Sequence, residues 1–217
     1  MNWIDFFILF VLFLALLNGY RRGVFKEIST FIGLIFGVVF AVSNADWLAM
    51  RLDGMVNMSP SVLYVLSFIV VFLAFMLALK LIGRYFYKLV KITPMTVPNK
   101  ISGSVFGILK GLIVLSLLFL LFIFPTPFKN FDSAIADSSL AKPIRGFVPV
   151  IYDHTNYLHP RSENFLAEIQ NGILLSNADK YADDPESALK DKALLGMTDE
   201  DVKTLDKLRS YFGKEQK

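Results

Sequence analysis

The sequence has 217 residues, of which 54% are hydrophobic and 14% aromatic, and its mean hydropathy is positive. This composition leaves too much apolar surface for a water-soluble globular protein, so a soluble domain is excluded and a membrane protein is indicated. The chain has no cysteine, which excludes disulfides, zinc–thiolate sites and thiol catalysis.

The net charge of +3 is divided unevenly along the chain. Residues 1–124 carry ten Lys and Arg against four Asp and Glu, whereas residues 125–217 carry twelve against fifteen. Positive charge concentrated in an apolar half is typical of membrane topology rather than of a basic solvent-exposed surface. We therefore expect no nucleic-acid partner.

Four apolar runs approach the roughly 20 residues that a helix needs to cross about 30 Å of hydrocarbon. The predicted spans are residues 3–18, 24–43, 61–82 and 103–124. After the last run, prolines interrupt the chain and its composition changes. The sequence therefore predicts an all-α membrane protein with four transmembrane helices in two hairpins, residues 1–124, and a mostly helical extramembrane tail, residues 125–217.

The first span begins with an acid, Asp5. At a helix start a carboxylate is favourable to the helix dipole and easy to hydrate, so one interpretation is an interfacial helix cap. Buried in the bundle, the same carboxylate would mark an ion or proton path. Both interpretations stay open at this point.

The loops differ in charge. The turn after the first span holds Arg21 and Arg22, and residues 80–100 hold five cations and no acid, whereas residues 43–61 hold two acids and one cation. Excess Lys and Arg mark cytoplasmic loops. We expect a multi-pass membrane protein with its amino terminus and its tail outside the cytoplasm, which is the periplasm if the cell is Gram-negative.

Small residues recur at every fourth position in the second and fourth spans. Such rows let two membrane helices approach closely where little hydrophobic drive brings them together. We predict that these two spans pack against each other along the rows, with homo-oligomer contacts as the competing use. The rows are Ser29, Gly33, Gly37 and Ala41 in the second span, and Gly103, Gly107 and Gly111 in the fourth.

Basic residues continue the helical pattern of the third span, with aromatic residues between them. Spacings of four, four and three put the cations on one helical face, which suits the anionic headgroups of cytoplasmic lipids. The predicted headgroup residues are Lys80, Arg84, Lys88 and Lys91.

The fourth span contains one cation, Lys110. It lies about one turn inside the hydrocarbon, so its long stem can reach back to the headgroups. The alternative is an ion pair with Glu27, which lies at similar depth on the second span. Arg22, just before that span, is a further candidate functional charge.

Several of these features occur together in a known order. They are the Trp-Ile-Asp start, Gly19-Tyr20-Arg21-Arg22-Gly23, Glu27, Asn99-Lys100, Gly103, Gly107 and Lys110-Gly111. The set resembles the colicin V production (CvpA) family of bacterial inner-membrane proteins over about residues 1–150. Where that family tends to have an acid and an arginine, this chain has Asn99 and Lys110, which alters any role that needs a carboxylate or a bidentate guanidinium.

The tail carries three helix signals. One runs from Ser162 to about Asn171, another begins at Asp184-Pro185 and ends at Gly196, and Thr198-x-x-Asp201 is a capping box for the third. The third has an apolar stripe that we expect to dock on the tail or the bundle rather than on a partner. The stripe is Val202, Leu205, Leu208 and Phe212.

No catalytic motif can be found: there is no Gly-rich phosphate loop, no GxSxG and no HExxH. Asp153, His154 and His159 have a spacing that fits no common metal site. We expect a protein without enzymatic activity, cofactor or metal.

Three functional hypotheses remain. The resemblance implies a non-enzymatic accessory protein in toxin production or export and in envelope homeostasis. The alternative is a small transporter or channel subunit, in which Asp5, Arg22, Glu27 and Lys110 face a polar cavity. In the third, the membrane helices hold a tail that binds an envelope partner. The expected partners are the lipid bilayer, and a second copy of the chain or an envelope protein.

Overall fold

The structure is a computed structural model. It describes residues 2–53, 55–56, 58–89, 97–124, 134–135, 137–155, 157, 164–175 and 199–212, and of residues 84–89, 175, 199, 200 and 212 the helical backbone alone. The secondary structure of the described residues is helical, without strands. This confirms the predicted all-α class.

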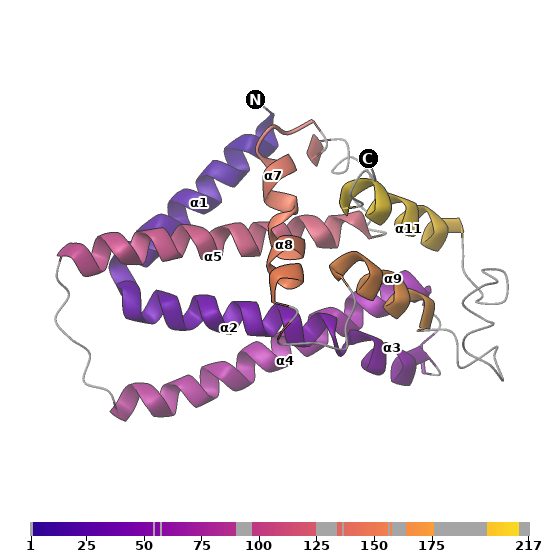
Figure 1. The fold of residues 1–217 in the computed structure, drawn as a ribbon, viewed down its shortest axis with the longest axis horizontal. Coiled ribbons are helices and arrows are strands. Elements are labelled where there is room, and N and C mark those ends of the chain that lie inside the picture. Colours follow the sequence, from indigo (N-terminus) through magenta and orange to yellow (C-terminus); the bar gives the residue numbers. More distant parts are fainter. Residues whose placement is uncertain are drawn as a thin grey trace. The chain divides into compact units, whose positions relative to one another are not determined.

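Four helices of the described residues are long and apolar enough to cross a membrane, as predicted (Figure 1). They are α1 (Trp3–Arg22), α2 (Val24–Val42), α4 (Pro60–Leu89) and α5 (Val97–Ile123). The 30 residues of α4 and the 27 of α5 give lengths of about 45 and 40 Å, more than the roughly 30 Å of hydrocarbon. Helix α4 continues past residue 82, as the predicted basic extension of the third span requires, whereas α5 begins six residues before the predicted start at residue 103.

Shorter helices follow in the connections and the tail. They are α3 (Ala45–Asp53), α7 (Ala141–Arg145), α8 (Phe147–His154), α9 (Phe165–Leu175) and α11 (Asp199–Phe212). The described parts of the tail are mostly helical, as predicted, with α9 and α11 close to two of the three expected helices. The expected helix at 185–196 lies outside the described residues. The sequence did not predict α3, because its nine residues are too few and too mixed to give a clear period.

The start and the end of α1 are both set by local hydrogen bonds. The backbone N–H of Asn2 donates to Oδ2 of Asp5 at 2.8 Å, and the Asn2 side chain accepts from the N–H of Trp3 at 2.7 Å. At the other end Gly23 has φ of 77°, and its N–H donates to the carbonyl of Gly19 at 3.0 Å. Only glycine adopts this φ without strain, so Gly23 allows α2 to begin immediately after α1.

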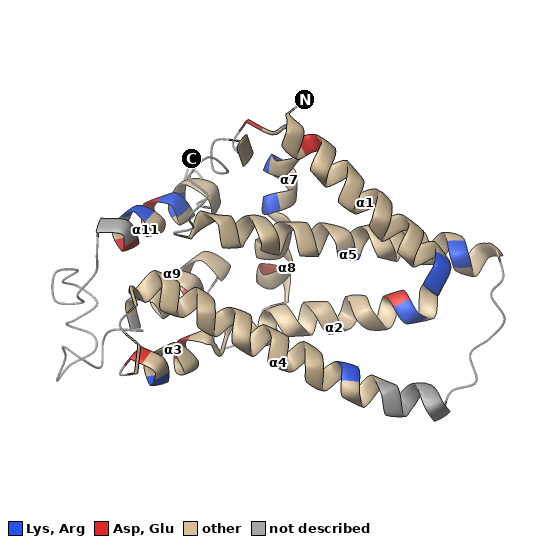
Figure 2. Ribbon diagram, turned by 180° about the vertical axis from the view of Figure 1, so that it is seen from behind, with Lys and Arg blue, Asp and Glu red and all other residues tan. Residues whose placement is uncertain are grey.

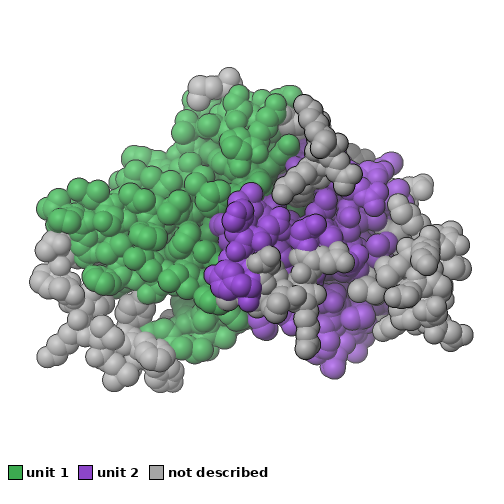
Figure 3. All heavy atoms as spheres, in the orientation of Figure 1, with its two compact units in different colours: residues 1–38, 74–120, 128–148 green, residues 39–73, 121–127, 149–217 purple. Residues whose placement is uncertain are grey.

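The described residues cluster into two compact units (Figure 3). Unit 1 comprises residues 1–38, 74–120 and 128–148, and unit 2 comprises residues 39–73, 121–127 and 149–217. Each unit combines segments from both sides of residue 124, where the sequence predicts that the membrane domain ends. That boundary stays a prediction.

Unit 1 is built around α5. Ile113 and Leu115 of α5 are almost fully buried, as are Ile4 and Ile8 of α1. On the outer face of α1, large apolar side chains are instead exposed, which fits a helix surface that faces acyl chains. They include Phe6, Phe10, Phe13 and Leu17.

Unit 2 packs tail helices on the segment between α2 and α4. Helix α9 contacts α3 and α11. The Tyr152 and Phe165 rings meet edge to face, 5.6 Å apart. Leu205 and Leu208 on the stripe of α11 are buried and α11 contacts α9, which confirms docking on the protein's own tail for this part of the stripe. Val202 is half-buried, and the side chain of Phe212 lies outside the described atoms.

Candidate functional site

Helices α1 and α5 touch backbone to backbone at a row of small residues. A Cβ added to Gly103 would lie 2.5 Å from the carbonyl oxygen of Gly19, and one added to Gly107 would lie 2.5 Å from the carbonyl oxygen of Ala15. Farther along, Gly111 faces the side chains of Ala15 and Leu12. Residue numbers rise on one helix as they fall on the other, so the two helices are antiparallel.

This contact corrects the predicted pairing of the two small-residue rows. The row of Gly103, Gly107 and Gly111 faces α1, not the row on α2. On α2, Gly33 lies under the side chain of Leu79 from α4 instead. The prediction that the rows of the second and fourth spans face each other is therefore wrong.

The other three small residues of the α2 row differ in their exposure. Ser29 is exposed and donates to the carbonyl of Phe25 at 2.9 Å, while Gly37 and Ala41 are buried. The partner that was missed is the row Ala15, Gly19 and Gly23, which has the same four-residue spacing. Bulky Phe and Leu neighbours obscure that row in the sequence.

A capping interaction continues the α1–α5 contact beyond Gly23. The side-chain oxygen of Asn99, in the first turn of α5, accepts a hydrogen bond from the N–H of Val24 at 2.8 Å. It thereby satisfies one of the N–H groups at the start of α2 that have no partner within the helix. Gly103 packs on the backbone of Gly23 beside it. One end of α5 therefore holds the turn between α1 and α2.

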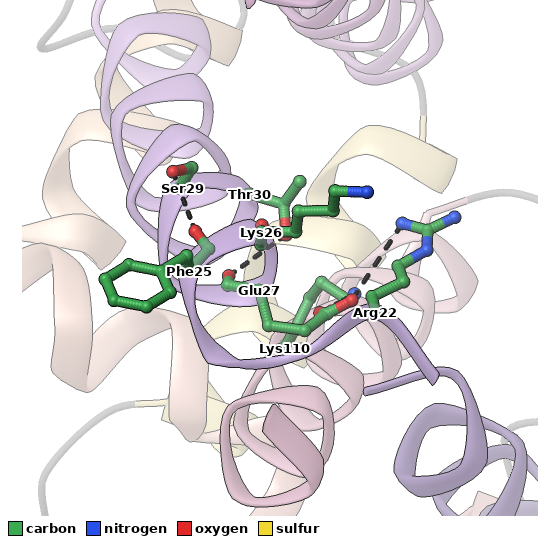
Figure 4. A network of polar contacts seen from close by, with 7 residues as sticks. All are labelled: Arg22, Phe25, Lys26, Glu27, Ser29, Thr30 and Lys110. Carbon is green, nitrogen blue, oxygen red and sulfur yellow. Dashed lines mark hydrogen bonds and ion pairs between the residues drawn. The ribbon is translucent and has the colours of Figure 1, made fainter. Parts of the chain in front are cut away.

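A buried ion pair lies next to this turn (Figure 4). Glu27, in the first turn of α2, is 0% exposed, and its Oε2 accepts from Nζ of Lys110 on α5. Nη1 of Arg22 lies 3.9 Å from Oε1 of the same carboxylate, and that oxygen has no hydrogen-bond partner among the described residues. Of the two interpretations of Lys110, the structure shows the pair with Glu27.

Burial differs across this cluster. The Lys110 side chain is 18% exposed and that of Arg22 is 50% exposed. An isolated carboxylate in an apolar surrounding is costly, so Glu27 depends on Lys110 for neutralisation. Phe31 and Phe106 meet edge to face, with centroids 5.8 Å apart, and add an aromatic contact between α2 and α5.

Most of the residues that carry the resemblance to a known family lie around Gly23, on the ends of α1, α2 and α5. A family model described as colicin V production protein matches residues 4–149, two-thirds of the chain. The chain belongs to this family. Comparisons with curated proteins and with solved structures gave no match. With four membrane-length helices, this member of the colicin V production family is a multi-pass membrane protein.

The colicin V production region also contains Asp5, whose role the structure defines. Its Oδ1 accepts from the Ser138 hydroxyl at 2.5 Å and from the N–H of Leu140 at 3.1 Å, in addition to the Oδ2 bond from Asn2. Asp5 therefore caps α1, as the first interpretation predicts, but it is buried (1% exposed) rather than hydrated, and it also holds the segment before α7. It lies about 25 Å along α1 from Arg22, so the structure does not bring it to the Glu27 cluster.

The predicted headgroup residues are only partly described. Lys80 is exposed on α4. Arg84 and Lys88 belong to the helical backbone of α4, without described side chains, and Lys91 lies outside the described residues. Their contact with anionic headgroups stays a prediction.

Two hydrogen bonds connect the tail to the first turns of membrane helices, one at α1 and one at α4. Asp5 ties the start of α1 to Ser138 in unit 1, and in unit 2 Asp201 of α11 accepts from the N–H of Ser61 at 3.0 Å. The charge count predicts that both of these helix ends and the tail lie outside the cytoplasm, and that orientation stays a prediction. Among the described residues no group of His, Asp and Glu is arranged for a metal, and His159 lies outside them.

Proposed function

We propose that the chain is a non-enzymatic accessory protein of the bacterial inner membrane, acting in colicin or toxin production or export and in envelope homeostasis. The family match over residues 4–149 supports the link to colicin production. The observation that carries a specific role is the buried Glu27–Lys110 pair, with Arg22 beside it, at the junction of α1, α2 and α5. Charged pairs inside membrane segments are costly and are usually functional.

The test compares variants of the pair in cells. A strain that lacks the gene and carries a colicin V export system is complemented with the wild type, with Glu27→Gln or with Lys110→Met. We expect secreted toxin to fall in both variants while membrane levels of the protein stay measurable. Unchanged secretion in the deletion strain itself would refute a role in toxin export. Sensitivity to detergent in the same strains reports the envelope function separately.

A transporter or channel subunit is the second candidate function. The observation that favours it is Oε1 of Glu27, a buried carboxylate oxygen within a candidate membrane span that accepts no hydrogen bond from the described residues and has only Arg22 near it, at 3.9 Å. Liposomes that contain the purified protein test it. Ion or solute flux that is present in the wild type and lost in Glu27→Gln would support transport. Asp5→Asn serves as the comparison, because Asp5 caps α1 far from the pair and its loss should leave flux intact.

The hypothesis of a tail that binds an envelope partner is tested by truncation. The tail helices α9 and α11 lie beyond the family match. We propose that the tail instead supports α3 and the start of α4, which it contacts in unit 2. Removal of residues 162–217 should then reduce the amount of folded protein. Full stability of the truncated chain, with loss of toxin export, would favour a partner.

A further inference from the structure

The turn at Gly23 is surrounded by more cations than are needed to neutralise the carboxylate of Glu27. Glu27 is the only carboxylate of the described residues 6–38 and 97–120. Lys110 occupies it, which leaves four cations around the turn. They are Arg21, Arg22, Lys26 and Lys100. Figure 2 shows Lys and Arg gathered where the ends of α1, α2 and α5 meet.

Arg22 is the cation best placed to bind an external anion. At 3.9 Å from Glu27 it lies at the outer limit of an ion pair and makes no hydrogen bond to Oε1, and half of its side chain is exposed. Its guanidinium donors therefore stay available for a bidentate contact with a phosphate. In Figure 4 the Arg22 guanidinium and the Lys26 amino group extend to the same side, past Glu27.

The other two cations lie at the same junction. Lys100 follows Asn99, which caps α2, and its Nζ lies 5.6 Å from the centroid of the Tyr20 ring. Arg21 is exposed in the last turn of α1. Among the described residues, neither makes a salt bridge. The close contact of Gly23 with Gly103 brings the two helix ends, and hence these cations, together.

The surroundings of the four cations are apolar and exposed. Tyr20, Phe25, Val97 and Ile101 are 43%, 62%, 64% and 57% exposed on the same three helix ends. A small soluble anion would contact only the cations and leave these apolar side chains exposed to water. A lipid would contact both, because its phosphate can bind the cations and its acyl chains can pack on the apolar side chains. Basic and aromatic residues at the ends of membrane helices are typical of contact with anionic headgroups.

We propose that Arg22, with Arg21, Lys26 and Lys100, binds the phosphate headgroup of an anionic membrane lipid. This site is distinct from the basic extension of α4. The inference rests on the proposed function, because it assigns a ligand to the junction that contains the Glu27–Lys110 pair. Binding would place a lipid phosphate beside that pair, where it competes with Glu27 for Arg22.

The test uses the full chain, purified in neutral detergent micelles. Phosphatidylglycerol, phosphatidylcholine and inorganic phosphate are added separately, and binding is followed by native mass spectrometry and by the thermal unfolding midpoint. We expect retention and stabilisation by phosphatidylglycerol alone. Arg22→Gln should weaken that binding about fivefold, which corresponds to about 1 kcal/mol for one basic group near a lipid surface.

The matched control is Arg51→Gln, which removes an arginine that stacks on Trp47, 4.5 Å from the ring centroid, in α3. Equal effects of the two substitutions, or equal binding of the two lipids, would overturn the proposal. Equal stabilisation by inorganic phosphate would also overturn it, in favour of a soluble anion. If Arg22→Gln fails to fold, the double variant Arg21→Gln and Lys100→Gln, which leaves the Glu27 pair intact, replaces it.

The lipid-binding experiment and the toxin-secretion experiment can fail independently of each other. Binding to the purified protein requires no toxin, so toxin export that depends on Glu27 together with no lipid preference would refute the lipid site alone. Selective lipid binding together with unchanged export in the deletion strain would refute the proposed function alone.

Discussion

Asp201 of α11 accepts a hydrogen bond from the backbone N–H of Ser61, 3.0 Å away, in the first turn of α4. The two residues are 140 positions apart in sequence. A carboxylate at this position satisfies one of the free N–H groups of the helix start and interacts favourably with the helix dipole. A membrane helix therefore begins on a cap that the end of the tail supplies.

Replacement of Asp201 by alanine should destabilise unit 2 by about 1 kcal/mol, because the cap of α4 is lost. Thermal unfolding in detergent measures the loss, and hydrogen exchange should speed up at the amides of the first turn of α4. Asp206→Ala is the control, since Asp206 is exposed on the same helix. Equal effects of the two substitutions would contradict the capping role.

The α1–α5 contact predicts that Gly103→Ala is destabilising. The added Cβ would meet the carbonyl oxygen of Gly19 at 2.5 Å, and backbone cannot move aside as a flexible side chain can. We expect a loss of about 1–3 kcal/mol, typical of overpacking. At Gly146 the nearest atom to an added Cβ is 3.8 Å away, so Gly146→Ala should leave the unfolding midpoint nearly unchanged. A neutral Gly103→Ala would rule out the close backbone contact.

The Glu27–Lys110 pair predicts unequal effects of its two single substitutions. Lys110→Met leaves a fully buried carboxylate with only Arg22, 3.9 Å away and half exposed, and should cost about 3–5 kcal/mol. Glu27→Gln should cost less, because the partly exposed Lys110 can reach water. A double-mutant cycle with Glu27→Leu and Lys110→Met should give a combined loss well below the sum. Additive losses would show that the pair is not coupled.

Two tyrosines of unit 2 should respond in opposite ways to loss of their hydroxyls. The Tyr64 hydroxyl is buried without a hydrogen-bond partner in the described part of the chain, so Tyr64→Phe should be neutral or stabilising. The Tyr152 hydroxyl is hydrogen-bonded to the Ser43 hydroxyl at 3.2 Å, and Tyr152→Phe should cost about 1 kcal/mol. Thermal unfolding of both variants decides the point. A larger loss in Tyr64→Phe than in Tyr152→Phe would contradict the structure.

The absence of cysteine allows a direct test of topology. Single cysteines at Ser102 and Asp137, both exposed, report the start of α5 and the segment bound to Asp5. A maleimide that cannot cross membranes should label the residue at 137, and not the one at 102, in cells whose inner membrane is intact. Lysed cells, in which both should react, provide the control. The reverse pattern would invert the proposed orientation.

Much of the fold follows from local sequence. Four membrane helices can be predicted because hydrocarbon supplies no hydrogen-bond partner for backbone N–H and C=O groups. A long apolar segment must therefore pair these groups internally, as a helix does. The cap at Asp5 and the end of α1 at Gly23 also depend on neighbours within a few residues. The pairing of Glu27 with Lys110 could be proposed because both lie near the same end of their helices.

Only the tertiary structure decided which surfaces meet. Two rows of small residues on α2 and α5 fit each other in sequence, yet the backbone of α5 approaches Ala15 and Gly19 on α1. Any two rows with four-residue spacing are compatible, so spacing alone does not select the partner. Asp201 is a second case: its sequence pattern predicts a capping box with Thr198, which lies outside the described residues. Its carboxylate caps α4 because the packing of the tail brings that helix start within reach, and no local pattern encodes such packing.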